Sequence, residues 1–310
     1  MDLEPKIVIL LSTYNGEDYL AEQLDSLIKQ TYSNFIIIIR DDASNDSTEQ
    51  IINHYVERNQ GKIHKLSGIN SNVGPGSSFG LLIKYAIKEK IALGVSRLYM
   101  MLCDQDDIWI EEKLKIQMLE MLNAERKSPD APIMVHSDLK VVDQSKRVIA
   151  ESFVKYQGLE VERNKFTNVV ISNLVTGCTT LFNEELAQIA LPIPGNAIMH
   201  DWWLALTASV FGRVIFIDMP LVEYRQHENN TIGAKEFEKH RPSRKKIMEV
   251  VFSRKESDHL VEVAHQAFEF KARFGSFLSF EENLCLWFSS MMKLQNGFLQ
   301  RVFYRLARLF

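Results

Sequence analysis

The first hundred residues alternate apolar runs of strand length with segments of helical periodicity. The pattern predicts strands at 6–12, 35–40, 62–66 and 97–102, and helices at 17–30, from 46 onward and at about 77–92. The run at 35–40 is almost unbroken isoleucine, which is typical of a strand buried on both faces. Strands that alternate with helices in this way predict an α/β fold with a mostly parallel open sheet flanked by helices.

From about residue 132 the alternation loosens into shorter strand-like pieces, and an apolar helical run opens at His200. Strands are predicted after this run, at 214–217 and 222–226. After Gly233 the character changes again, because the tail holds eleven of the eighteen phenylalanines. We therefore predict a catalytic domain at 1–232, with a nucleotide-binding half at about 1–107 and an acceptor half at about 108–232. Residues 233–310 form a helical, basic and aromatic-rich C-terminal extension in this prediction.

Polar side chains follow three of the predicted strands at the point where each ends. They are the strings 12–16 (Ser-Thr-Tyr-Asn-Gly), 41–44 (Asp-Asp-Ala-Ser) and 104–107 (Asp-Gln-Asp-Asp). Ligands of open α/β sheets bind beyond the carboxyl ends of the strands, so these strings mark one candidate site. Several carboxylates gathered at one edge repel each other unless a cation or a polar ligand is present.

Asp104 and Asp106 carry the strongest chemical signal. Hard oxygen ligands at a strand end suit Mg²⁺ or Mn²⁺, which bridges the oxygens of a bound diphosphate. The alternative is an acidic cap for a helix predicted at 108–122. Asp41 and Asp42 could likewise cap the helix from 46, or accept hydrogen bonds from a base imide or a ribose hydroxyl.

Further along the chain, three features each have a functional and a structural interpretation. Asp201 precedes an apolar helical run and is either a catalytic carboxylate or a helix cap. Trp109 and Trp202 could stack on a sugar ring, or pack in the core. His227 closes a predicted strand and is either a ligand or a surface histidine. The Gly74-Pro75-Gly76 string has the wrong spacing for a dinucleotide fingerprint and predicts a turn that enters a helix.

Composition excludes several classes of protein. With 310 residues, 46% of them hydrophobic, the chain can form a full globular core. Its three cysteines are far apart, which indicates neither a disulfide framework nor a zinc site and favours a reducing cytoplasm. The longest uncharged stretch, 166–183, is half Thr, Asn, Ser or Gly, so we expect no transmembrane helix. Residues 1–224 carry net charge −9, which disfavours nucleic-acid binding, whereas 225–310 carry +5.

Five strings in this order resemble family 2 glycosyltransferases of the GT-A fold, over residues 6 to about 232. They are 12–16, 40–46 (Arg-Asp-Asp-Ala-Ser-Asn-Asp), 104–109 (Asp-Gln-Asp-Asp-Ile-Trp), 200–203 (His-Asp-Trp-Trp) and 224–227 (Tyr-Arg-Gln-His). Together with 137–143 and 176–179, they are similar to bacterial rhamnosyltransferases that build rhamnose-rich wall or capsule polysaccharides. The resemblance implies a nucleotide-diphospho-sugar transferase that inverts the anomeric carbon.

The resemblance also assigns roles by position. Asp201 would be the catalytic base, and Asp104, Asp106 and His227 would hold Mn²⁺ or Mg²⁺. The nucleotide sugar would contact Ser12, Thr13, Tyr14, Asn15, Asp41, Asp42, Asp104 and Gln105. The transferred sugar or the acceptor would contact Trp109, Gly177, His200 and Trp202. Ala43 stands where the family pattern often has glycine, and we expect an unstrained backbone there.

Near its end the chain predicts a basic amphipathic helix. Apolar residues recur at helical spacing from Phe298 to Phe310, while Arg301, Arg305 and Arg308 fall on another face. Such a helix can lie on an anionic membrane, helped by basic residues at 241–246, or its aromatic face can pack on the catalytic domain or on a second subunit.

We therefore expect a cytoplasmic, membrane-peripheral enzyme that moves L-rhamnose from dTDP-L-rhamnose onto a lipid-linked saccharide. The alternatives are a UDP-hexose donor, or a carbohydrate-binding subunit without catalysis.

Overall fold

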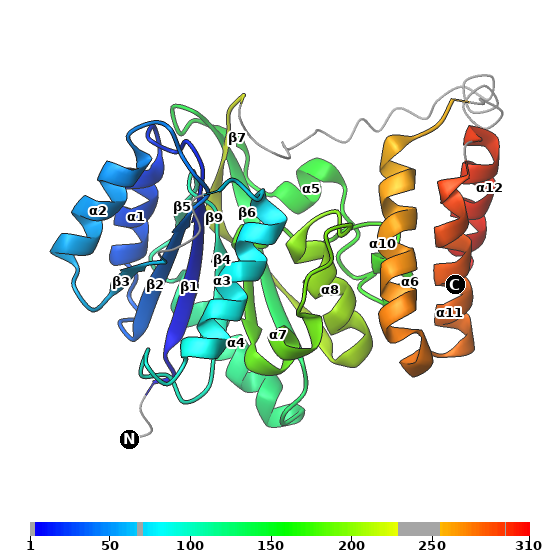
Figure 1. Cartoon of the computed structure of the whole chain (residues 1–310), viewed down its shortest axis with the longest axis horizontal. Helices are drawn as coiled ribbons and strands as arrows, with labels where there is room; N and C mark the ends of the chain where they lie inside the picture. Colours follow the sequence, from blue (N-terminus) through cyan, green and yellow to red (C-terminus); the bar gives the residue numbers. More distant parts are fainter. Residues whose placement is uncertain (1–3, 67–70, 229–254, 295) are drawn as a thin grey trace.

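The computed structural model describes residues 4–66, 71–228, 255–294 and 296–310. The strands are β1 (Ile7–Thr13), β2 (Phe35–Asp41), β3 (Ile63–Lys65), β4 (Tyr99–Cys103), β5 (Ile108–Trp109), β6 (Ile133–Asp143), β7 (Val148–Ala150), β8 (Thr180–Asn183) and β9 (Arg213–Gln226). The helices are α1 (Leu20–Ile28), α2 (Thr48–Arg58), α3 (Pro75–Glu89), α4 (Lys113–Lys127), α5 (Phe153–Gln157), α6 (Phe166–Val169), α7 (Glu184–Ala190), α8 (His200–Phe211), α10 (Asp258–Phe274), α11 (Phe280–Ser290) and α12 (Gly297–Ala307). Figure 1 shows their arrangement.

Within these residues the strands form one sheet in the order β3-β2-β1-β4-β8-β6-β9-β5, with β7 paired to β6. The first four of these strands are parallel, as the βαβ pattern predicts. Strand β8 then enters between β4 and β6 and runs antiparallel to both. The longer pairings of the sheet are parallel, and shorter antiparallel pairings make it a mixed sheet. Strand β9 pairs in parallel with β6 and antiparallel with β5, so the second half of the sheet contains both kinds of pairing.

Successive side chains of β1 point to opposite faces of the sheet and enter two different cores. Each core is covered by helices, so helices lie on both faces. Ile7, Ile9 and Leu11 pack with α1, α2 and α4, whereas Val8 and Leu10 pack with α3, α7 and α8. All five side chains are fully buried. The parallel strands consequently end together at one edge, where the loops that follow β1, β2 and β4 meet.

Two predicted elements differ in the structure. The helix expected at 108–122 begins only at Lys113, because Ile108 and Trp109 form strand β5 and pair with Glu223 and Val222 of β9. The strands expected at 214–217 and 222–226 are one strand, β9, whose register against β6 shifts near Asp138. In both places pairing with a distant strand decides the local structure.

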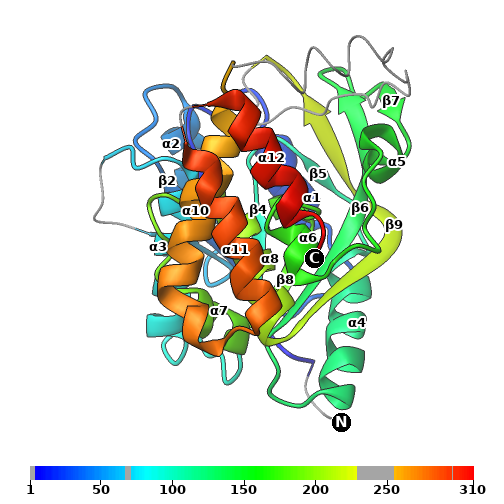
Figure 2. The ribbon, with the colours of Figure 1, turned by 90° about the vertical axis from the view of Figure 1, so that its right-hand side faces the viewer.

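The C-terminal helices α10, α11 and α12 belong to the same core as α3, α7 and α8 (Figure 2). Phe270 of α10 packs edge-on against Trp203 of α8, with ring centroids 5.2 Å apart. Arg273 donates hydrogen bonds to the carbonyls of Ile189 and Pro192, at the end of α7. The predicted boundary near residue 233 and the basic residues at 241–246 lie outside the described residues. No described helix combines the length and the apolar character that a membrane span requires.

Candidate active site

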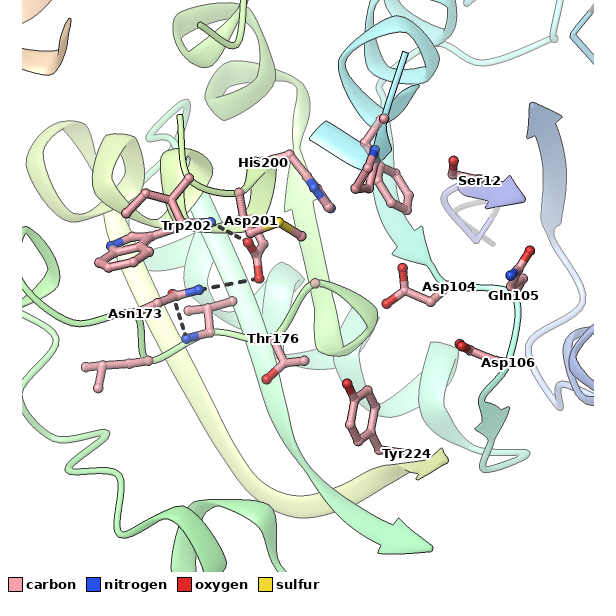
Figure 3. A pocket seen from close by; sticks show the side chains of 18 of the residues that line it. Ser12, Asp104, Gln105, Asp106, Asn173, Thr176, His200, Asp201, Trp202 and Tyr224 are labelled. Carbon is pink, nitrogen blue, oxygen red and sulfur yellow. Dashed lines mark hydrogen bonds between the residues drawn. The ribbon is translucent and has the colours of Figure 1, made fainter. Parts of the chain in front are cut away.

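A cavity of about 740 Å³ opens at the edge where β1, β2 and β4 end (Figure 3). Asp42, Asp106 and Asp201 all line it, although they come from three separate parts of the chain. Of the predicted site residues, those that line this cavity are Ser12, Thr13, Tyr14, Asp42, Asp104, Gln105, Asp106, Gly177, His200, Asp201 and Trp202. The cavity lies within the size range of small-molecule sites.

The loops that follow β1 and β2 are joined by hydrogen bonds. Asp41 accepts bonds from the Thr13 hydroxyl at 2.9 Å and from the Ser44 backbone N–H at 2.9 Å. Asn15 donates its backbone N–H to Ser44 Oγ and accepts one from the Asn45 N–H. Asp41 and Asn15 are therefore not among the residues that line the cavity. Their hydrogen bonds shape the two loops, and their predicted contact with the nucleotide sugar stays a prediction.

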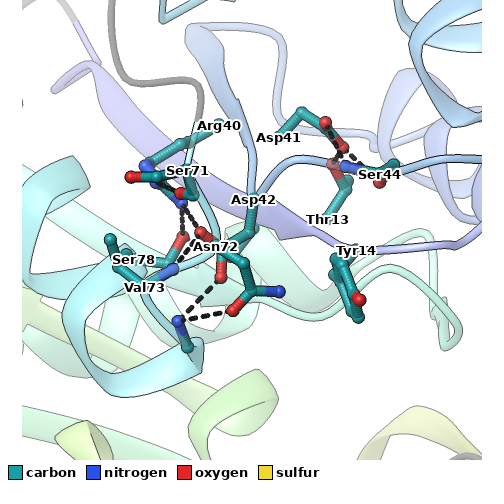
Figure 4. A network of polar contacts seen from close by, with 12 residues as sticks. Thr13, Tyr14, Arg40, Asp41, Asp42, Ser44, Ser71, Asn72, Val73 and Ser78 are labelled. Carbon is teal, nitrogen blue, oxygen red and sulfur yellow. Dashed lines mark hydrogen bonds and ion pairs between the residues drawn. The ribbon is translucent and has the colours of Figure 1, made fainter.

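Asp42 lies at the centre of a second network (Figure 4). Its Oδ1 accepts bonds from Arg40 Nη1 at 2.6 Å and from the Val73 N–H at 2.8 Å, and its Oδ2 accepts one from the Gly74 N–H at 2.8 Å. Asp42 is 3% exposed and Arg40 is 1% exposed. A carboxylate has about four acceptor positions, so Asp42 Oδ2 retains one for a ligand in the cavity.

Two residues in or next to this network have positive φ angles. Gly74 has φ +78° and precedes Pro75, the first residue of α3, which confirms the predicted turn into a helix. Ala43 has φ +65°. This value corrects the expectation of an unstrained backbone, because a side chain in the left-handed region costs roughly 1–2 kcal/mol.

Gln105 holds Tyr14 in place. Its Oε1 accepts the Tyr14 N–H at 2.8 Å, and its Nε2 donates to the Tyr14 carbonyl at 2.9 Å. Gly16 makes room for this pairing, since a Cβ at that position would lie 2.3 Å from Gln105 Oε1. The Tyr14 side chain is 47% exposed at the cavity mouth, where a base can stack on it.

The acidic edge carries the charge of the site. His227 Nε2 lies 2.8 Å from Asp106 Oδ2, so the ends of β4 and β9 meet there. Burial, followed by the nearby charges of Asp106 and Asp201, raises the pKa of Asp104 to about 7. Burial, followed by the nearby charges of Asp106 and Asp104, raises the pKa of Asp107 well above its usual value.

A divalent cation fits this edge. Asp104, Asp107 and Cys178 each offer a ligand atom within 4.8 Å of the others. This group differs from the predicted ligands Asp104, Asp106 and His227, of which His227 Nε2 and Asp106 Oδ2 lie 2.8 Å apart. Two carboxylates with an imidazole are nevertheless donors that suit Mn²⁺ or Mg²⁺. Positive charge would also relieve the repulsion that raises the pKa of Asp104.

Asp201 lies on the other side of the cavity, in the first turn of α8. Its Oδ1 accepts the Trp202 N–H at 2.7 Å, and its Oδ2 accepts a long bond from Asn173 Nδ2 at 3.4 Å. The N-cap of α8 is Met199, so Asp201 is not the cap that the alternative interpretation required. Burial raises the pKa of Asp201 to about 6, which is close to the range of a general base.

His200 is buried with neither ring nitrogen hydrogen-bonded to any described residue. It stacks on Phe79 with ring centroids 4.1 Å apart, and burial lowers its pKa to about 3, so the ring is neutral. An unpartnered polar ring that lines a cavity is available to a ligand. Gly177 lies beside it, since a Cβ there would be 3.4 Å from His200 Nε2.

The two tryptophans differ. Trp202 lines the cavity, although its indole N–H donates to the Val169 carbonyl at 2.6 Å and it is only 4% exposed. Trp109 is buried in the other core, with the Lys113 ammonium 4.2 Å from its ring centroid. This corrects the predicted sugar contact of Trp109. Its place in strand β5, not helical periodicity, decides where it points.

Several cavity residues were not predicted. Asn173 and Thr176 come from the loop before β8, and Tyr224 comes from β9. The string at 176–179 pointed to this loop, and the string at 224–227 pointed to Tyr224. His259 and Glu262 come from α10 and no motif in the sequence marks them.

Comparison with known proteins agrees with this geometry. A glycosyltransferase is the class that the fold and site define, and residues 8–188 match the family described as Glycosyl transferase family 2. The chain therefore belongs to glycosyltransferase family 2, and its fold is the GT-A fold with a C-terminal helical region.

Among curated relatives, the chain is 31% identical over 236 residues to the dTDP-rhamnosyl transferase RfbG of Shigella flexneri. This match covers 72% of the chain and 74% of the relative. Among solved structures, the chain is similar to S. aureus TarS 1–349, with a TM-score of 0.52, 17% identity, and coverage of 96% of this chain and 82% of that one.

The mannosyltransferase PcManGT of Pyrobaculum calidifontis, in complex with GDP-Man and Mn²⁺, has a TM-score of 0.50 at 14% identity. This match covers 99% of the chain and 81% of PcManGT. At this identity the structural neighbours support the fold alone.

Proposed function

We propose that the enzyme transfers L-rhamnose from dTDP-L-rhamnose to a lipid-linked saccharide, with inversion, in cell-wall or capsular polysaccharide synthesis. The observation that carries this proposal is one cavity lined by an acidic edge on one side and by a lone carboxylate, Asp201, on the other. The similarity to RfbG supports rhamnose and thymidine as the donor's parts.

The side of the cavity opposite Asp201 has a place for each part of the donor, the nucleobase and the diphosphate. Tyr14 offers a stacking face, and Asp42 Oδ2 keeps an acceptor position for the imide N–H of a pyrimidine base. Asp104, Asp106 and His227 would hold Mn²⁺ or Mg²⁺ beside the diphosphate. When bound, the cation would offset the negative charge of the departing nucleoside diphosphate.

The reaction then needs one displacement. The acceptor oxygen forms a bond to the anomeric carbon while the bond from that carbon to the diphosphate oxygen breaks. Asp201 takes the proton of the acceptor hydroxyl, and the nucleoside diphosphate leaves with the electron pair. A single displacement inverts the anomeric carbon, and it requires no second carboxylate as nucleophile.

Donor binding gives the direct test. We would measure thermal unfolding with dTDP-L-rhamnose, UDP-glucose, UDP-galactose and UDP-GlcNAc, each with and without Mn²⁺. Selective stabilisation by dTDP-L-rhamnose with Mn²⁺ is expected, because a ligand that binds only the folded state raises its stability. A larger shift with a UDP-hexose would contradict the rhamnose donor. Binding without any hydrolysis or transfer would favour the carbohydrate-binding alternative.

The C-terminal helix is the proposed attachment to the inner face of the cytoplasmic membrane. Leu309 is 76% exposed and Phe310 39% exposed at its end, and Arg305 is also exposed. Phe303 packs on Trp287 and Phe288 of α11, and Phe310 also stacks on Phe288, so part of the predicted apolar face is used inside the molecule. The exposed end leaves a basic and aromatic surface for anionic lipid.

Reversal of charge tests this attachment. Replacing Arg305 and Arg308 with Glu should abolish co-sedimentation with vesicles that contain 30% phosphatidylglycerol, while Lys293→Glu serves as a control outside α12. Equal co-sedimentation of all variants would contradict the membrane role. A dimer by light scattering that the double substitution dissociates would favour the second-subunit alternative.

A further inference from the structure

One wall of the cavity comes from α10, in the C-terminal part of the chain. His259 and Glu262 of this helix line the same cavity as Asp201 and Asp104. Their side chains are 60% and 59% exposed, and His259 Nδ1 lies 3.8 Å from Glu262 Oε2. The His259 ring faces the indole of Trp202, with ring centroids 6.0 Å apart and planes at 31°. His259 therefore lies beside Trp202, which directly follows the proposed base, Asp201.

The rest of α10 fixes the position of this pair. Val263, Ala267 and Phe270 are buried against the core. Gln266, 1% exposed, accepts the backbone N–H of Ile198 through Oε1 at 3.0 Å, two residues before α8 begins. The start of α10 therefore presents polar residues to the cavity, and the rest of the helix presents apolar residues to the core. Because α10 and α8 are packed together, His259 and Glu262 have a fixed location relative to Asp201.

We infer that His259 and Glu262, in the first two turns of α10, form the acceptor subsite, and that it binds hydroxyl groups of a neutral saccharide. This inference rests on the proposed function. The acidic edge takes the donor diphosphate, so the acceptor approaches Asp201 from the side of α10 and the 172–176 loop. A carboxylate accepts and an imidazole can donate or accept, and 3.8 Å between them suits two neighbouring hydroxyls of one sugar ring. The Glu262 charge disfavours an acceptor sugar that is itself anionic there.

The test separates acceptor from donor. Release of dTDP from dTDP-L-rhamnose with Mn²⁺ would be followed in water alone and with octyl glycosides of L-rhamnose, GlcNAc and galactose. For the glycoside that raises the rate most, Glu262→Gln and His259→Ala should each raise the acceptor KM about tenfold, the size of one lost charged hydrogen bond. The Kd of dTDP and the rate of release to water should not change.

Two controls on the same helical region match these variants. His265→Ala and Glu281→Gln remove exposed residues that do not line the cavity, and both should leave the acceptor KM unchanged. An unchanged acceptor KM in Glu262→Gln and His259→Ala would overturn the inference. So would the failure of every glycoside to raise the rate above that in water. Failure of the wild-type enzyme to bind or cleave dTDP-L-rhamnose would instead reject the proposed donor.

Discussion

The two sides of the cavity differ in how their polar groups are satisfied. On the donor side, Asp41, Asp42 and Gln105 are each held by two or more hydrogen bonds to backbone or side chains of the loops. On the acceptor side, His200 has no partner among the described residues, and Asp201 has one long bond besides that to the next N–H.

This difference indicates a division of labour. Hydrogen bonds within the loops fix the shape of the donor side before a nucleotide arrives, which reduces the entropy cost of binding. On the acceptor side, burial raises the pKa of the Asp201 carboxylate, and the His200 ring is left open to a ligand. The first arrangement favours recognition, and the second favours proton transfer.

The largest effect is expected at Asp201. Asp201→Asn removes the proton acceptor but keeps the shape of the side chain, so kcat should fall by about 10²–10⁴. The Kd of dTDP-L-rhamnose, measured by calorimetry, should stay within about twofold, because the donor side is untouched. Turnover close to that of the wild-type enzyme would remove Asp201 from the mechanism.

Next in size is the buried pair of Arg40 and Asp42. Arg40→Met leaves the Asp42 charge buried without its partner, and the free energy of unfolding should fall by about 3–5 kcal/mol. Donor affinity should fall with it, since Asp42 holds Val73 and Gly74 at the cavity.

The double variant Arg40→Met with Asp42→Asn provides the control. It removes both charges, and the amide oxygen still accepts one of the two N–H groups of Val73 and Gly74, so chemical denaturation should show recovery of part of the loss. If the double variant loses as much unfolding free energy as Arg40→Met and Asp42→Asn lose together when measured singly, the pair is not coupled.

The change of turnover with pH should be smaller than the effects above, and its midpoint should give the pKa of the base. The pKa of Asp201 is raised to about 6 by burial, and only the carboxylate accepts a proton. The rate should therefore be constant well above pH 6 and fall about tenfold per pH unit below it. Thermal melts at each pH confirm that the enzyme stays folded. A rate that is flat down to pH 5 would argue against a buried carboxylate as the base.

The smallest effect concerns the backbone at Ala43. Since φ is +65° there, Ala43→Gly should relieve strain and raise the free energy of unfolding by about 0.5–1 kcal/mol, after the entropy that glycine adds to the unfolded chain. Chemical denaturation measures this change, and donor affinity should be unaltered. A decrease in stability would mean that the backbone at this residue is not strained.

Sequence patterns predicted the donor side better than the acceptor side. Strands β1, β2 and β4 are apolar and continuous, so their ends, and hence Tyr14, Asp42 and Asp104, could be placed at one edge from the order of elements alone. The family resemblance added Asp201 and His227, which no periodicity could have joined to that edge.

What could not be predicted depends on contacts between distant residues. Trp109 is buried because Ile108 and Trp109 pair with β9, and this pairing overrides the helical pattern that follows them. His259 and Glu262 reach the cavity because α10 packs on α8, a tertiary contact without a local signal. Asp41 faces the loop because Thr13 and Ser44 donate to it.

One measurement tests the central claim that both sides act on the same bound donor. ¹H NMR would follow dTDP-L-rhamnose and an octyl glycoside acceptor with the enzyme, in Mn²⁺ and in EDTA. The account predicts a glycoside whose anomeric configuration is opposite to that of the donor, formed in Mn²⁺ and lost both in EDTA and in Asp201→Asn. A product with retained configuration, or equal turnover in EDTA, would contradict it.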